Sequence, residues 1–268
     1  MAGYCAKPVR GGLKVAEHIA FGVDVGGSGI KGAPVDLATG GLAQPRFKIL
    51  TPRPSTPEAV VRVIGELIDH FDLPPEVPVG LSFPSPIVRG AVEWMANLDQ
   101  SWVGVNIEEA VMAGTGRRVT AVNDADAAGY AEVAFGAAKD HPGTVAVMTL
   151  GTGIGVALIT GGKLWPNAEL GHITINGRDA EKWAAASAKE RDGLSYARWA
   201  RRLQRYFREV DRLLWPDLFV VGGGISRKHE KFLPLLDIRP PIVPAALRNT
   251  AGIVGAAVLA GQAAGVVA

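Results

Sequence analysis

The pattern of apolar and polar positions gives the two halves of the chain the same beginning. Residues 19–25 are mainly apolar, a glycine-rich turn follows, and residues 30–36 form a second apolar run. The same order returns at 144–150, with a glycine-rich turn at 151–155 and an apolar run at 156–160. Short apolar runs bounded by glycine predict β-strands, so each half should open with a strand, a tight turn and a returning strand.

The remaining segments alternate between strand and helix patterns. In the first half we expect strands at 42–50, 77–83, 87–94 and 118–122, and helices at 58–71 and from Asn106 to the glycines at 114–116. In the second half we expect a helix after Asn123-Asp124, an amphipathic helix at 194–214, a strand at 218–221, and helices starting at Ser226 and Asn249. This alternation predicts the α/β class, and the repeated hairpin indicates a duplication with a cleft between the halves.

Composition narrows the classes of function. The chain has 268 residues, of which 48% are hydrophobic, enough for one large or two modest domains. Its net charge of +2 does not favour a nucleic-acid partner. Cys5 is the single cysteine, which excludes an internal disulfide and a cysteine-based metal site. No apolar run is long enough for a signal peptide or a membrane span, so we expect a soluble cytoplasmic protein without a membrane partner.

Three glycine turns are candidates for phosphate binding. The first, at 24–31, begins with the acid Asp24 at a strand end. The glycine loop that follows has backbone N–H groups that can contact phosphate oxygens. The third, at 221–226, leads from a strand toward a helix and suits an anionic ligand. The second, at 150–155, contains part of a dinucleotide fingerprint, but the β-type run 156–160 follows it where a nicotinamide-binding fold needs a helix. A nicotinamide oxidoreductase is therefore disfavoured, although each turn alone is also compatible with an ordinary hairpin.

Polar residues follow the strand expected at 118–122. Asn123 and Asp124 stand where that strand gives way to a helix, a usual position for functional groups in an α/β sheet. Asp124 has the chemistry of a general base and Asn123 can bind a neighbouring hydroxyl, but both residue types are also common helix N-caps. Glu169 and His172 place another acid and an imidazole close together.

The order of these elements resembles the ROK family of sugar kinases and repressors. The resemblance runs from about Ile19 to the C-terminal helix and rests on Asp24-Val25-Gly26-Gly27-Ser28, Phe83-Pro84-Ser85-Pro86, Asn123-Asp124, Leu150–Gly155, Glu169-Leu170-Gly171-His172 and Val221–Ile225. It implies an actin-like (ribonuclease H-like) fold of two α/β domains with a cleft between them. We expect residues 19–122 and a C-terminal helix at 249–268 in one domain, and residues 123–248 in the other. Within the family, the chain is similar to the polyphosphate glucokinases and the polyphosphate/ATP glucomannokinases.

The resemblance also implies roles for individual residues. Asp124 is expected to be the catalytic base that deprotonates the 6-hydroxyl of glucose or a related hexose such as mannose. The residues expected to bind the sugar are Ser85, Asn97, Asn123, Asp124, Glu169, His172 and Glu181. Those expected to bind the phosphates or nucleotide of the donor, polyphosphate or ATP, are Asp24, Gly26, Gly27, Ser28, Lys31, Gly151, Thr152, Gly153, Gly222, Gly223, Gly224 and Ser226. A homodimer is one option for the assembly.

The metal content follows from a departure from the family pattern. Many relatives carry a zinc-binding cysteine cluster shortly after the Glu-x-Gly-His element, whereas residues 176–181 occupy that stretch here without a cysteine. We therefore expect no zinc and assign no direct metal ligand. The expected cofactor is Mg²⁺, with Asp24 holding it through water, because Mg²⁺ prefers oxygen ligands and keeps its waters.

The family resemblance leaves two alternatives to a sugar kinase. A repressor needs a winged helix-turn-helix domain before the first hairpin, and only about eighteen residues precede Ile19, so a repressor is disfavoured. A sugar-responsive regulatory protein without catalysis stays open, although an intact Asp124 and the phosphate loops argue against it.

The amphipathic helix at 194–214 leaves a further alternative. Its apolar side consists of Trp199, Leu203, Tyr206, Phe207, Val210, Leu213 and Leu214, and its opposite side carries Arg198, Arg201, Arg202, Arg205, Arg208 and Arg212. Such an arginine face is usually an ordinary solvated surface. Arginine also forms bidentate contacts with phosphate oxygens, so this helix is a second candidate surface for a polyphosphate chain.

Overall fold

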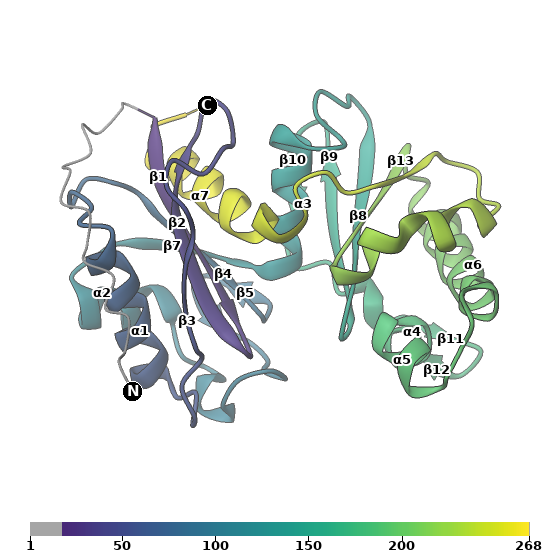
Figure 1. Cartoon of the computed structure of the whole chain (residues 1–268), viewed down its shortest axis with the longest axis horizontal. Coiled ribbons are helices and arrows are strands. Elements are labelled where there is room, and N and C mark those ends of the chain that lie inside the picture. The colour runs from purple at the N-terminus through teal and green to yellow at the C-terminus, as the bar shows by residue number, and fades with distance from the viewer. Residues whose placement is uncertain (1–17, 268) are drawn as a thin grey trace, which may run out of the picture.

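The computed structural model describes residues 18–267 and shows two α/β halves side by side (Figure 1). Cys5 lies outside the described range. The first sheet has the order β3-β2-β1-β4-β7 and consists of β1 Ile19–Gly26, β2 Gly29–Asp36, β3 Phe47–Ile49, β4 Val79–Phe83 and β7 Val119–Asn123. The second has the order β10-β9-β8-β13-β14 and consists of β8 Thr144–Leu150, β9 Ile154–Thr160, β10 Lys163–Trp165, β13 Leu218–Gly222 and β14 Ile242–Pro244.

The two sheets repeat one another strand by strand. In each, the first two strands form an antiparallel hairpin, a third short strand extends that hairpin, and a later strand pairs in parallel with the first. The predicted α/β class and the repeated hairpin are confirmed. Because a β-strand and not a helix follows the turn at 151–153, the dinucleotide reading of that turn is excluded.

Helices cover both faces of each sheet. They are α1 Pro57–His70, α2 Ile107–Thr115, α3 Asp124–Phe135, α4 Ala180–Ala184, α5 Ala186–Arg191, α6 Tyr196–Leu214 and α7 Ala251–Ala263. The outer face of the first sheet packs against α1 and α2, and the outer face of the second packs against α4 and α6. The inner faces carry α7 and α3 respectively, and these two helices contact each other in the middle of the molecule (Figure 1). None of the helices in the described range has the length and apolar run that a membrane span requires.

Small residues let α7 lie unusually close to the first sheet and to α3. Along β1, Phe21 and Val23 face the α1 side, so the alternation of a strand places Gly22 on the α7 side. A Cβ atom on Gly22 would stand 1.9 Å from the carbonyl oxygen of Ile253, and one on Gly80 would stand 1.9 Å from that of Ala256. These positions therefore require glycine.

Several expected elements differ from the structure. The expected strand at 42–50 is reduced to β3 and an isolated bridge at Leu42, because Pro45 has no N–H to donate to a ladder. The expected strand at 87–94 is instead the small hairpin of β5 Ile87–Val88 and β6 Ala91–Val92, which turns at Arg89 and Gly90, both with positive φ. One further short hairpin, β11 Thr174–Ile175 with β12 Arg178–Asp179, precedes α4.

Two expected helices also differ. The α-helix expected from Ser226 is a 3₁₀ segment, Gly224–Lys231, interrupted by non-helical backbone at Lys228. The C-terminal helix begins at Ala251 after a 3₁₀ turn and ends at Ala263, within the expected 249–268 range. Because α7 packs on the first sheet, we keep its assignment to the first domain as a proposal, together with the boundaries 19–122 and 123–248.

Replacing Gly80 with Ala tests the close approach of α7. The new Cβ would meet main-chain atoms of Ala256, so the helix must shift, and we expect a loss of about 2–3 kcal/mol in the free energy of unfolding. Gly65→Ala is the matched control, because the nearest atom to its new Cβ is a Thr115 methyl at 3.4 Å. Alanine favours a helix, so this variant should gain up to about 1 kcal/mol. Urea unfolding measures both, and equal behaviour of the two variants would contradict the packing argument.

Candidate active site

A cavity of about 300 Å³ lies between the two halves and collects the residues expected to bind a sugar. The first half contributes the segment from Pro84 to Asn97, and the second contributes the turn between β8 and β9 and the loop before α4. The expected residues Ser85, Asn97, Asn123, Asp124, Glu169, His172 and Glu181 all line it. Residues that are up to 96 positions apart in the chain therefore meet at one surface, as hydrogen-bonding groups in a mostly polar pocket.

The end of β7 and the start of α3 place Asn123 and Asp124. Asn123 is the N-cap of α3, and its Oδ1 accepts from the N–H groups of Ala125 at 2.9 Å and Asp126 at 3.3 Å. This contact fixes the side chain and leaves its NH₂ group without a hydrogen bond to the described residues, available as a donor toward the cavity. The capping and ligand-binding interpretations of Asn123 are therefore compatible.

Asp124 opens into the cavity but is closely surrounded by protein from both halves. Burial, together with the negative charge of Asp24, raises the pKa of its carboxyl group to about 6. The N–H of Ala125, which donates to Oδ1 at 2.8 Å, opposes the rise. A carboxylate with a pKa near 6 is ionised at neutral pH and is still basic enough to accept a proton from a hydroxyl group.

The loop before α4 supplies a second group of titratable side chains. His172 Nδ1 lies 3.0 Å from Asp179 Oδ2, and this hydrogen bond raises the pKa of the imidazole. Burial raises the pKa of Glu169, although the charge of His172 acts in the opposite direction. Glu181 Oε2 accepts from the N–H of Ile154 at 2.9 Å, so this side chain holds the second glycine turn while it lines the cavity.

Ser85 and Trp94 form the wall contributed by the first half. The hydroxyl of Ser85 is buried and donates to the main-chain oxygens of Trp94 and Pro86. Since its one hydrogen is used in this way, Ser85 can only accept hydrogen bonds from a ligand. The ring of Trp94 lies edge-to-face with the imidazole of His172, with 5.9 Å between the ring centroids. Trp94 was not predicted as a site residue, because nothing in the sequence around it distinguishes it from a surface aromatic residue.

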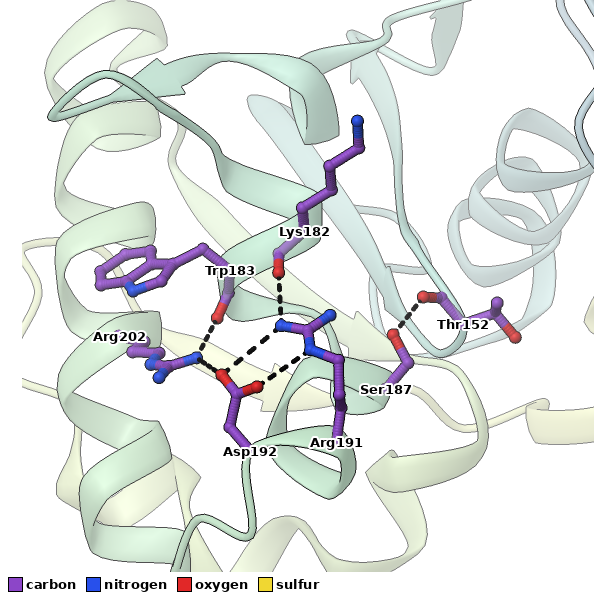
Figure 2. Close-up of polar contacts among 7 residues, drawn as sticks. All are labelled: Thr152, Lys182, Trp183, Ser187, Arg191, Asp192 and Arg202. Atoms are coloured by element: carbon purple, nitrogen blue, oxygen red, sulfur yellow. Dashed lines mark hydrogen bonds and ion pairs between the residues drawn. The ribbon is translucent and has the colours of Figure 1, made fainter.

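Helix α5 and its neighbours hold the second glycine turn, as Figure 2 shows. Ser187 donates through its hydroxyl to the Thr152 oxygen and through its N–H to the Gly151 oxygen. Asp192, just after α5, accepts from Arg202 of α6 at 2.6 Å. Gly151, Thr152 and Gly153 line the same cavity as the sugar candidates. Ser187 therefore fixes this turn to α5, and Asp192 at the other end of α5 ties that helix to α6.

A second cavity of about 350 Å³ adjoins the first. Its lining consists of Asp24, Lys31, Arg46, Ser82, Asp124, Ala128, Thr149, Gly223, Arg248, Asn249, Ala251 and Gly252. The two cavities share Asp124, Thr149 and Gly223, so the carboxyl group of Asp124 stands at their junction. In this second cavity, Lys31 Nζ forms an ion pair with Asp24 Oδ2 at 3.1 Å.

Not every residue expected at a phosphate site lines a cavity. Gly26, Gly27, Ser28, Gly222, Gly224 and Ser226 line neither of the two. The Ser226 hydroxyl is buried and donates to the Gly223 oxygen, so it stabilises the third turn from within. Arg46 and Arg248 were missed, because both stand in connecting segments whose spacing carries no signal of a site.

Comparison with known proteins identifies the family of the chain. The family model described as the ROK family matches residues 20–187. The chain belongs to the ROK family. A polyphosphate glucokinase of Mycobacterium tuberculosis is 50% identical over 247 residues, 92% of this chain and 92% of the relative.

Two solved structures share the fold of this ROK protein. An inorganic polyphosphate/ATP-glucomannokinase from Arthrobacter sp. strain KM has a TM-score of 0.85 and 50% identity, and the match covers 92% of this chain and 99% of that one. A ROK family glucokinase from Streptomyces griseus, in complex with glucose and AMPPNP, has a TM-score of 0.77 and 26% identity, covering 91% and 99%. The two-domain actin-like fold expected from the resemblance is confirmed.

The arginine face of α6 lies away from both cavities of this ROK protein. The helix is amphipathic as predicted and packs on the outer face of the second sheet, although Leu213 is exposed because it lies beyond the edge of the core. Figure 1 shows α6 on the side of that sheet opposite α7. Three of its arginines form ion pairs, with Asp192, Asp237 and Glu209. None of the arginines on this face lines either cavity, so their charges do not border the junction at Asp124.

Asp126 is a buried acid that the sequence analysis did not assign. Its Oδ2 accepts from the N–H of Asn167 at 2.7 Å, while Oδ1 has no hydrogen bond among the described residues. The side chain of Asn167 in turn accepts from the N–H of Ile87 at 3.0 Å and donates to its oxygen at 2.9 Å. Asp126 therefore connects α3, the loop before Glu169 and the β5–β6 hairpin of the other half.

Replacing Asp126 with Asn should change stability with pH. Burial raises the pKa of Asp126 to about 7, well above its unfolded value, so its contribution to stability is fully present below about pH 4 and lost as the pH rises through 7. At pH 8 the variant removes a buried charge and keeps an acceptor for Asn167. We expect a higher Tm than wild type at pH 8 and little or no gain at pH 5. Exposed Asp140→Asn is the control, and equal destabilisation by Asp126→Asn at both pH values would contradict the assignment.

Proposed function

We propose that this ROK protein transfers a phosphoryl group from inorganic polyphosphate or ATP to the 6-hydroxyl of glucose. The observation that carries the proposal is the position of Asp124 between the two cavities. One cavity offers the hydrogen-bonding groups that a hexose needs, and the other offers cations suited to phosphate. A phosphoryl group passing between donor and acceptor has to cross this junction. In-line transfer needs the attacking hydroxyl oxygen and the leaving oxygen of the shortened donor on opposite sides of the phosphorus, with the base beside the hydroxyl.

The side chains of the first cavity take the acceptor roles. Asp124 orients the 6-hydroxyl and accepts its proton as the oxygen attacks phosphorus. The NH₂ group of Asn123 donates to a neighbouring hydroxyl, and Glu169 accepts from another. Ser85 accepts a hydrogen bond, and His172, held by Asp179, donates one. The relative that is 50% identical is a polyphosphate glucokinase, which supports glucose as the acceptor. The solved structure that is 50% identical is a polyphosphate/ATP-glucomannokinase, which supports mannose as a second acceptor.

The second cavity has groups that suit the donor. Lys31 and the backbone at Gly223 line it, where they can offset the negative charge of the phosphates. Asp24 and Asp124 are close enough for the charge of Asp24 to raise the pKa of Asp124. A divalent cation bound near two such carboxylates would offset their mutual repulsion. No group of three or more acidic, histidine or cysteine side chains in residues 18–267 is placed to hold a metal, which suits an ion bound mainly by water and donor oxygens. Bound in this way, Mg²⁺ would neutralise charge on the transferring group.

Asp124→Asn tests the role of the base. The amide keeps the shape of the side chain but cannot accept the proton, so kcat for glucose 6-phosphate formation should fall by about 10²- to 10⁴-fold. The Kd for glucose, measured by calorimetry, should change by only a few-fold. Exposed Asp140→Asn should match the wild type. A kcat near the wild-type value in Asp124→Asn would reduce Asp124 to a helix residue and contradict its role as the base.

The pH profile of the wild type tests the environment of Asp124. Because its pKa is raised to about 6, the base is increasingly protonated below that pH, so kcat/KM should fall tenfold per unit on the acid side. Removing the charge of Asp24 with Asn should move this acid limb to lower pH, since Asp24 is one cause of the raised pKa. An acid limb centred near pH 4 in the wild type would contradict the assignment.

Metal dependence gives an independent check of the donor cavity. Chelation of divalent cations should abolish turnover with either donor, and Mg²⁺ should restore it, because the phosphates need a hard cation. Elemental analysis should find no stoichiometric zinc in the purified protein. Full activity in excess chelator, or one zinc per chain, would overturn this part of the proposal.

A further inference from the structure

The outer part of the second cavity carries a concentration of positive charge that the reaction at Asp124 does not use. Lys31 and Arg46 line it from neighbouring segments of the first sheet, and Arg248 lines it from the segment before α7. Arg46 precedes β3 and donates through Nη1 to the oxygen of Asn249 at 3.2 Å, which ties the two arginine-bearing segments together. Arg46 and Arg248 are exposed and form no ion pair in the described range, whereas Lys31 is paired with Asp24. Two unneutralised cations therefore face the mouth of the cavity.

The inner wall of the same cavity contains a polar group that lacks a partner. Ser82 on β4 is fully buried, and its hydroxyl has no hydrogen bond among the described residues. A buried polar group without a partner costs stability, so its retention points to a ligand. Ser82 faces the first turn of α7, where a Cβ on Gly252 would stand 3.2 Å from its Oγ. No side chain caps this end of α7, so the positive end of the helix dipole also faces the cavity.

The chemistry of the lining selects the class of ligand. The residues around the cavity are charged, polar or small, and they include no aromatic side chain on which a purine could stack. A hydroxyl donor, a helix N-terminus and two free guanidinium groups instead match successive phosphate groups of a linear chain. Asp24 and Asp124 stand at the inner end, where the transferring group and its cation belong.

We propose that Ser82 and the start of α7, with Arg46 and Arg248 at the mouth, form a subsite for the phosphates that follow the transferred one in a polyphosphate chain. The inference rests on the proposed function and names residues that contact a phosphate chain beyond the reach of ATP. Ser82 contacts the inner phosphates, which both donors possess. Arg46 and Arg248 contact outer phosphates, which only the longer chain possesses. The arginine face of α6 has no part in it.

The test is the double variant Arg46→Gln/Arg248→Gln in the full chain. Its KM for long-chain polyphosphate should rise about tenfold and become less sensitive to salt, because two exposed charges no longer attract the chain. Its KM for ATP and for glucose should stay within about twofold of wild type. The matched control is Arg201→Gln/Arg205→Gln on α6, which removes the same charge and should leave all three constants unchanged. An equal rise with both donors, no rise with polyphosphate, or a larger rise in the α6 variant would overturn the subsite.

A second variant tests the inner contact and remains informative whatever the double variant does. Ser82→Ala removes a hydroxyl that has no protein partner, so Tm should be unchanged or higher, while KM should rise several-fold for both donors. Unchanged donor constants in Ser82→Ala would overturn the role of Ser82.

Direct binding of a linear inorganic polyphosphate of many more than three phosphates, measured by calorimetry without glucose, separates this inference from the proposed function. Binding that weakens in both variants while the wild type turns over no sugar would retain the subsite and reject the kinase. Normal turnover by the wild type with unaltered binding in both variants would retain the kinase and reject the subsite.

Discussion

The close contact of α7 with the first sheet is the constraint on which the rest of the structure depends. Gly22 and Gly80 remove the side chains that would otherwise hold the helix away from β1 and β4. A third glycine, Gly255, allows the same helix to approach α3, where a Cβ would stand 1.7 Å from the oxygen of Ala127. Glycines on β1, on β4 and on α7 itself thus let one helix bring the two halves together.

This contact also decides where the chemistry can take place. It brings the first turn of α7 against Asp24 and Ser82, and it brings the start of α3, with Asp124, to the same depth in the molecule. A looser fit would separate the carboxylate of one half from the cations of the other. The packing between these helices therefore sets the position of the junction of the two cavities.

Electrostatics then distinguish the two sides of Asp124. Toward the first cavity lie further acids, and burial among them raises the pKa values of Asp124, Asp126 and Glu169. Toward the mouth of the second cavity lie the cations Arg46 and Arg248. An acidic side suits hydroxyl groups that donate hydrogen bonds, and a basic side suits phosphate. Arg202 of α6 instead pairs with Asp192, just after α5, and donates to the oxygen of Trp183 (Figure 2).

The sequence by itself determined the class and the duplicated hairpins. These depend on local rules: alternation of apolar residues, glycine at turns, and an N-cap such as Asn123 at the start of a helix. The polar residues expected around the sugar came from the resemblance of the motifs to the ROK family. Short or irregular segments were predicted less well, because Pro45 and the positive φ of Arg89 override the apolar pattern.

Only the tertiary structure decided which distant residues share a wall. Nothing in the local sequence around Arg46 and Arg248, 202 positions apart, indicates that they meet at one opening, and nothing around Ser82 indicates that its hydroxyl lacks a partner. The arginine face of α6 was visible in the sequence, yet the packing of that helix on the outer sheet face places it away from the junction. Periodicity tells which face of a helix is apolar, but which neighbours the polar face meets depends on contacts between segments that are remote in the chain.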